Sequence, residues 1–222
     1  MFYSPFTVFI FLLFLGIFLV LFFFVQLGAL TLAFTKLGIS PQYMLSLLFI
    51  TLIGSAINIP IKRIEEDQLC DEKVISFYGM RYQLPTPKKS CTTILAINVG
   101  GALIPVVISL YILTKCQVPF RALLATAIMS AVIYKLARPI KGVGIGVPFL
   151  IPPLLAALIA LVLAPANGPP VAYISGTLGT LIGADLLNLK RITGLGSPVA
   201  SIGGAGTFDG IFLTGIIAVL LT

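Results

Sequence analysis

The chain has 222 residues, of which 59% are hydrophobic and 9% charged, and it carries a formal net charge of +7. Soluble globular domains are roughly half apolar and about a quarter charged, so this composition excludes an ordinary soluble fold and predicts a multi-span membrane protein within the lipid bilayer. The basic residues are scattered at the ends of hydrophobic segments rather than gathered along one stripe, which argues against nucleic acid as a partner.

Seven apolar segments follow one another along the chain, each close to the length that crosses a bilayer as a helix. They cover about residues 6–34, 42–61, 92–114, 118–134, 145–164, 170–189 and 207–222. The first has no Lys or Arg before it and a long apolar core, so we expect a retained span rather than a cleavable signal. The prediction is an all-α fold: a polytopic membrane helix bundle of about seven transmembrane segments in a single integral membrane domain, residues 1–222.

Several segments contain Pro, Gly or Asn, as in INIP at 57–60, INVGGALIP at 97–105 and IGVPFLIPP at 145–153. Broken backbone inside a membrane is tolerated only beside protein or a wet cavity. We therefore expect these helices to surround something polar.

The polar loop 62–91 separates the second and third segments and holds two of the three cysteines, Cys70 and Cys91. The sequence KVISFYGMRYQLP between them alternates as a short β-hairpin does around a central Tyr-Gly pair. Such a hairpin brings the two thiols near each other, so they either form a disulfide in an external loop or are two unrelated buried thiols. Together with Cys116 they show no CxxC spacing, and the chain has no histidine, so we expect no metal and no cofactor.

The Lys and Arg residues of the short loops predict the orientation in the cell membrane. If every segment crosses and the N-terminus is inside, all basic residues lie on the inner side except Lys36, Lys115 and Arg121. Alternatively, segment 118–134 lies along the inner interface, the N-terminus is outside and the polar loop is external. Both arrangements place Lys190 and Arg191 inside and the C-terminus outside.

Two acids, Asp185 and Asp209, stand apart from the other five, which cluster between residues 65 and 72. They flank a Gly-rich connection over residues 190–206, and antiparallel neighbouring helices would bring them side by side near the inner membrane face. Two carboxylates in one site cannot both ionise cheaply, so one keeps its proton while the other acts as a base. Aspartyl hydrolysis of a peptide bond requires this division of roles.

Neighbouring residues support such a site. A strip of small residues allows close packing against another helix: Gly176, Gly179, Thr180 and Gly183. Asn188 lies at i+3 from Asp185 and is expected to hydrogen-bond it. Further supporting residues lie around Asp209 or on an earlier segment: Gly206, Thr207, Gly210 and Asn98. The threonine caps the last helix, the glycines permit close backbone approach, and the asparagine is a polar group of the third segment.

A structural interpretation explains the same acids without a function. Asp185 lies within six residues of Lys190 and Arg191, and ion pairs, helix caps or lipid headgroups account for both carboxylates. An acid inside a span is nevertheless costly, about 2.5 to 3.5 kcal/mol at the membrane centre, which makes it a candidate functional residue.

Four stretches of the sequence resemble an uncharacterised prokaryotic family of multi-pass membrane proteins, domain of unknown function 1614. They are INIPI, GVGIGVPFLIPP, GTLGTLIGADLLNL and SIGGAGTFDGIFLTG. The resemblance covers most of the chain from the second segment onward and implies a membrane location. The acid pair alone distantly resembles presenilin-type intramembrane aspartyl proteases, in which the second acid belongs to a Gly-x-Gly-Asp motif. Here that motif reads Gly206-Thr207-Phe208-Asp209, without the second glycine, and Ala184 rather than Tyr precedes the first acid.

Three functions follow from these observations. The first is an intramembrane aspartyl protease-like hydrolase that uses Asp185 and Asp209 on a membrane-protein substrate. The second is a cation- or proton-coupled transporter or channel that uses the same acids. The third is a noncatalytic subunit that works with partner subunits in a membrane complex.

Overall fold

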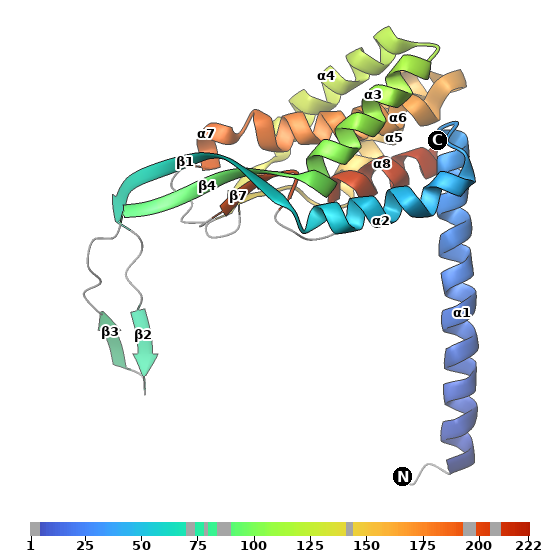
Figure 1. Ribbon diagram of the computed structural model, residues 1–222, viewed down its shortest axis with the longest axis horizontal. Coiled ribbons are helices and arrows are strands. Elements are labelled where there is room, and N and C mark those ends of the chain that lie inside the picture. The colour runs from blue at the N-terminus through green and yellow to red at the C-terminus, as the bar shows by residue number, and fades with distance from the viewer. Residues whose placement is uncertain are drawn as a thin grey trace.

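The computed structural model describes residues 5–69, 74–77, 80–83, 90–140, 144–192, 199–204 and 210–222. This part of the chain is mostly helical, as the sequence predicts, and it also contains small β-sheets. One long helix, α1, projects from a body of packed helices, and a β-ribbon leaves that body on the other side (Figure 1).

Helix α1 (Pro5–Lys36) forms from a run of Leu, Phe, Val and Ile that is interrupted only by isolated small or polar residues. Along most of its length its side chains are exposed and apolar on every side, as in a helix surrounded by lipid. The last turns join the body, because Ala33 and Phe34 are buried there. The Lys36 amine also donates to the Val219 carbonyl at 3.5 Å, near the negative end of the C-terminal helix.

The body is built around α6 (Gly168–Thr180), which is buried along almost its whole length. It packs against α3 (Ile104–Lys115), α4 (Pro119–Leu136), α5 (Ile151–Leu163) and α8 (Gly210–Leu221). A Cβ on Gly179 would lie 2.6 Å from the Met129 Cβ, and one on Gly183 would lie 2.5 Å from the Ser130 carbonyl oxygen. The predicted strip of small residues is therefore confirmed at these two glycines, where it allows α4 to approach.

Shorter elements complete the helical part. A 3-10 turn, η1 (Pro41–Tyr43), leads into α2 (Met44–Ser55), and another, η3 (Pro165–Asn167), precedes α6. Two π-helical turns, η2 (Val99–Leu103) and η4 (Leu181–Leu186), lie before α3 and after α6, and α7 (Leu189–Ile192) follows the second. The outward faces of α2 to α5 expose large apolar side chains, among them Phe49, Val107, Phe120 and Val162.

The strands form three small sheets. β1 (Asn58–Leu69) and β4 (Ser90–Asn98) pair antiparallel with Asn58 opposite Asn98, and β7 (Val199–Ile202) pairs parallel with β4. β2 (Val74–Phe77) and β3 (Met80–Gln83) form the predicted antiparallel hairpin, and β5 (Arg138–Ile140) pairs with β6 (Gly144–Gly146). Cys70 lies outside the described residues, so both alternatives for it and Cys91, a disulfide or two unrelated thiols, stay predictions.

The expectation of about seven spans is not confirmed. By length and composition, two helices of the described chain can cross a membrane, Val8–Lys36 and Pro119–Leu136. The expected span 42–61 turns into β1 after α2, and the expected span 92–114 begins as β4. The start of β1 contains Ile59 and Ile61, and β4 contains Thr92, Thr93, Ile94 and Ile97. Such branched side chains favour strands, and hydropathy alone does not separate an apolar strand from an apolar helix.

Candidate functional site

Asp185 lies in the π-helical turn η4, directly after the central helix α6. The wider turn is defined by a hydrogen bond from the Leu187 N–H to the Ile182 carbonyl at 2.9 Å, which closes over five residues instead of four. Such turns accommodate an extra residue in a helix and are frequent at functional sites. Here the turn carries the acid at the point where the helix meets the sheet.

The Asp185 carboxylate accepts a hydrogen bond from a backbone N–H, with 2.7 Å between Gly203 N and Asp185 Oδ2. Gly203 follows β7 and has a φ of +87°, a conformation that residues with a side chain rarely adopt. A Cβ at this position would also lie 2.6 Å from the Ala102 N in η2. The end of β7 therefore turns tightly between the two π-helical turns, and this turn presents its N–H to the acid.

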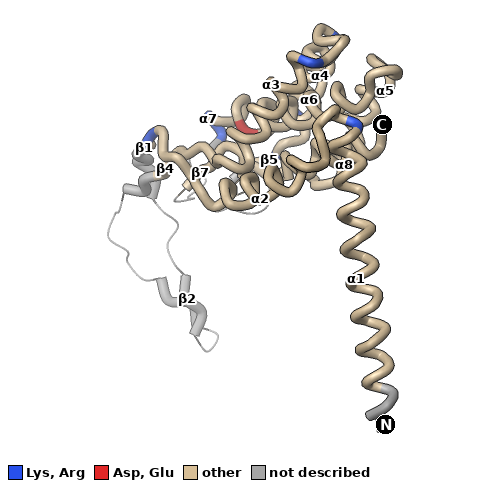
Figure 2. Tube along the Cα trace, turned by 45° about the vertical axis from the view of Figure 1, so that its right-hand side comes forward, with Lys and Arg blue, Asp and Glu red and all other residues tan. Residues whose placement is uncertain are grey.

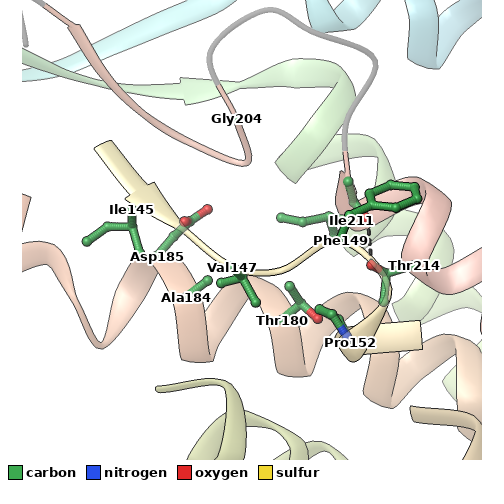
Figure 3. A pocket seen from close by; sticks show the side chains of 11 residues that line it. Ile145, Val147, Phe149, Pro152, Thr180, Ala184, Asp185, Gly204, Ile211 and Thr214 are labelled. Carbon is green, nitrogen blue, oxygen red and sulfur yellow. Dashed lines mark hydrogen bonds between the residues drawn. The ribbon is translucent and has the colours of Figure 1, made fainter. Parts of the chain in front are cut away.

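Asp185 lines a cavity of about 180 Å³ (Figure 3). The lining comes from β6 and the chain up to the first turn of α5, from the end of α6 and η4, from the turn after β7, and from the start of α8: Ile145, Val147, Phe149, Pro152, Thr180, Ala184, Asp185, Gly204, Gly210, Ile211 and Thr214. A mostly apolar lining with a few placed polar groups is typical of a small-ligand site, and the volume is sufficient for several water molecules.

Thr180 contributes a buried hydroxyl to this cavity. The residue is 6% exposed, and its Oγ has no hydrogen-bond partner among the described residues. The other threonine of the lining, Thr214, donates to the Gly210 carbonyl at 2.6 Å, the usual arrangement for a threonine in a helix. A buried hydroxyl costs free energy unless it is hydrogen-bonded, so Thr180 is available to a water or ligand atom.

Asn188 differs from its expected role. It is fully buried, and its side-chain amide donates to the Gly183 carbonyl at 2.8 Å instead of to Asp185. The π-turn explains this contact, because the Leu187 N–H, which would donate to the Gly183 carbonyl in an α-helix, donates to the Ile182 carbonyl instead. Asn188 therefore stabilises the turn that carries the acid.

Asn98 is a structural residue outside the cavity lining. It is 1% exposed, and its side-chain amide donates to the Ser55 carbonyl at 2.7 Å and to Asn58 Oδ1 at 3.1 Å. Its own Oδ1 accepts from the Gly101 N–H at 2.7 Å and so caps η2. The Ser201 hydroxyl donates to the same Asn58 oxygen at 2.6 Å. These bonds connect α2, η2 and all three strands of the larger sheet.

The comparison with protein families gives one result for this chain. Residues 52–221 match the model of a family described as a protein of unknown function, DUF1614. The chain belongs to DUF1614. Neither the curated proteins nor the solved structures that were compared contain a match. The matched range includes the sheet, α6 and the Asp185 cavity, so the cavity belongs to the DUF1614 domain, whereas α1 precedes it.

The second predicted acid, Asp209, lies outside the described residues of this DUF1614 chain, as do Gly206 and Thr207. The next residue, Gly210, begins α8 and lines the cavity. The backbone directly after Asp209 therefore reaches the same cavity as the Asp185 side chain.

Arg191 of α7 contacts Tyr134 of α4. Its guanidinium lies 4.9 Å from the centre of the Tyr134 ring and donates to the Tyr134 hydroxyl at 3.4 Å. The Arg191 guanidinium is thus used by Tyr134, and the other structural explanations of the acid, a helix cap or lipid headgroups, stay predictions. Figure 2 shows an acidic segment in red close to α7, whose basic residues are drawn in blue.

The sequence did not predict the roles of Thr180, whose buried hydroxyl lines the cavity, and Gly203, whose N–H binds Asp185. Thr180 was expected only as a small packing residue, and Gly203 only as part of a Gly-rich connection. The consecutive glycines of SIGG after a short apolar strand were the available signal for a tight turn, whereas no sequence pattern announces a π-turn. Within the described residues, no three His, Cys, Asp or Glu side chains gather into a group that could hold a metal ion.

Proposed function

We propose that this DUF1614 protein is a multi-pass protein of the cell membrane that binds a cation or proton at Asp185 in the course of transport. The apolar outer faces of α1 to α5 support the membrane location, because soluble monomers rarely expose contiguous apolar patches larger than a few hundred Å². In this arrangement the shorter helices of the body lie within the bilayer beside α1, and the C-terminus is outside.

The environment of Asp185 carries the proposal. The carboxylate lies in the π-helical turn that ends α6 and faces a cavity, and among the described residues its partner is one neutral N–H, that of Gly203. Asp185 is partly buried, and removing a carboxylate from water without a compensating charge is costly, so an acid that serves only stability would be expected to have a cationic partner. Discontinuous helices with an ionisable residue are the usual ion-binding elements of membrane transporters.

Flux into proteoliposomes tests this function. The full chain is reconstituted, and sodium-, potassium- and pH-gradient-driven uptake is measured for the wild type, for Asp185→Asn and for Thr126→Val. Thr126 is a buried threonine of α4 whose hydroxyl donates to the Ala122 carbonyl at 2.8 Å, outside the cavity lining, so its variant controls for fold. Flux should be lost with Asp185→Asn and kept with Thr126→Val; equal flux in all three proteins would refute the proposal.

Hydrolysis is the second candidate, and the position of Gly210 favours it. Because this glycine lines the cavity, the neighbouring Asp209 is a candidate second carboxylate beside Asp185, as in an aspartyl dyad. One acid would polarise the peptide carbonyl while the other activates a water. Cleavage of co-expressed single-span reporter proteins should then disappear in both Asp185→Asn and Asp209→Asn, whereas an ion site at Asp185 alone leaves Asp209→Asn able to transport.

A further inference from the structure

We infer that Thr180 and Asp185 together bind one monovalent inorganic cation, sodium or potassium, in the cavity at the end of α6. The inference rests on the proposed role of Asp185 in transport and deepens it by naming the class of ion. Asp185 contributes the negative charge, and Thr180 contributes an oxygen that contacts the ion directly or through one of its water molecules.

The π-turn is what brings these two side chains to one cavity. In a regular α-helix, residues five positions apart lie roughly 140° from each other around the axis and face different neighbours. The extra residue in η4 removes most of this offset, and both Thr180 and Asp185 line the cavity. Figure 3 shows them on the same side of the helix, facing the segment between β6 and α5.

Both groups have free capacity for a ligand. Asp185 uses Oδ2 for the Gly203 N–H, and its Oδ1 accepts no hydrogen bond from the described residues. The Thr180 Oγ also has no partner among them and lies on a residue that is 6% exposed. Two oxygens without a hydrogen-bond partner among the described residues, in the lining of a cavity with room for water, are donors expected around a partly hydrated hard cation.

The single negative charge of Asp185 and the oxygen donors of the cavity favour a monovalent ion. Divalent cations in proteins are usually held by several carboxylates or by nitrogen and sulfur ligands, and the described residues contain no such group. One carboxylate balances one positive charge, and oxygen donors suit an alkali cation. A proton alone would need only the carboxylate and would give the Thr180 hydroxyl no part in binding.

Equilibrium binding of ²²Na⁺ to the purified full chain in detergent tests the inference, with potassium and choline chloride as competitors at constant ionic strength. The wild type should bind sodium, potassium should compete and choline should not. Thr180→Val, which keeps the shape and removes the hydroxyl, should weaken sodium binding about tenfold or more, the usual loss for an altered metal-site contact. Thr180→Ser should restore it, and Asp185→Asn should abolish it.

The controls separate this inference from the proposed function. Thr126→Val should bind sodium as the wild type does, and the thermal unfolding of each variant in choline chloride shows whether it is folded. If Thr180→Val does not fold, Thr180→Ala takes its place. Equal sodium affinity in the wild type and Thr180→Val, or no binding of either cation, would overturn the inference. If the wild type still shows proton flux that Asp185→Asn abolishes, the proposed transport function stands without the sodium site. If the wild type shows no flux of any ion, the transport function and the cation site are both refuted.

Discussion

Single residues fix the site through the backbone geometry that they permit. Gly203 is placed by two constraints at once, its positive φ and the backbone of η2 close to its Cα. Because its N–H is the described partner of the Asp185 carboxylate, any movement of this glycine also alters the hydrogen bond that the carboxylate accepts. The shape of the turn and the chemistry of the cavity are therefore linked at one position.

Gly203→Ala should destabilise the protein by more than the cost of a positive φ alone. That cost is about 1 to 2 kcal/mol for a residue with a Cβ, and the Cβ would in addition lie 2.6 Å from the Ala102 N. Gly38 is the matched control, because its φ is +73° but a Cβ added there would have no atom within 4 Å. Thermal unfolding in detergent should show a larger loss for Gly203→Ala than for Gly38→Ala, and equal losses would contradict the close approach.

Asn98→Ala should lower stability without a direct effect on the cavity. The change leaves the Ser55 carbonyl and the Gly101 N–H without their side-chain partner, and an unsatisfied buried polar group costs about 1 to 3 kcal/mol. The control is Thr114→Ala, which removes an exposed hydrogen bond to the Tyr111 carbonyl. Chemical denaturation should distinguish the two variants clearly; similar midpoints would show that Asn98 does not connect the sheet to the helices.

At the scale of elements, α6 and α4 depend on the small residues between them. A Cβ on Gly183 would meet the Ser130 carbonyl oxygen and, at 2.9 Å, the Ile133 Cβ. Backbone atoms cannot move aside as a flexible side chain does, so the two helices would have to separate. The π-turn begins within this contact, and the packing of α4 therefore helps to position Asp185.

Gly183→Ala should destabilise the protein, although alanine is the better helix former by about 0.5 to 1 kcal/mol. We expect the forced separation to cost about 1 to 3 kcal/mol. Gly16→Ala in α1, where nothing lies within 4 Å of the added Cβ, should be neutral or stabilising. If thermal unfolding shows that both variants are more stable than the wild type, α4 does not approach α6 closely at this point.

The elements also show what the sequence could and could not predict. The long runs that form α1, α4 and α6 with η4 were predicted within a few residues, because apolar length and small-residue spacing are local signals. The hairpin of β2 and β3 was predicted from its alternation. The pairing of β1, β4 and β7 was not, because it joins Asn58, Asn98 and Ser201 across the whole chain. The face of the helix to which Asp185 belongs was also unpredictable, since it depends on the π-turn.

For the whole molecule, the distribution of apolar surface decides where the protein resides. Helix α1 contributes its last turns to the core through Ala33 and Phe34, while the part before them is exposed. The body exposes its own apolar faces on α2 to α5, with Phe120 as much as 77% exposed. If the body itself lies in the bilayer, α1 adds to its membrane attachment but is not required for it.

Removal of residues 1–25 should leave a folded body that stays in the membrane. The truncation keeps Ala33, Phe34 and the Lys36 contact to the end of α8, so thermal unfolding in detergent should change little. Membranes from cells expressing the truncated chain are washed with alkaline carbonate, which releases peripheral proteins, and the pellet is compared with that of the full chain. Because the exposed apolar faces of α2 to α5 would still need lipid, the truncated protein should remain in the pellet. Its release as a folded soluble protein would mean that α1 alone attaches it and that the cavity at Asp185 lies outside the bilayer.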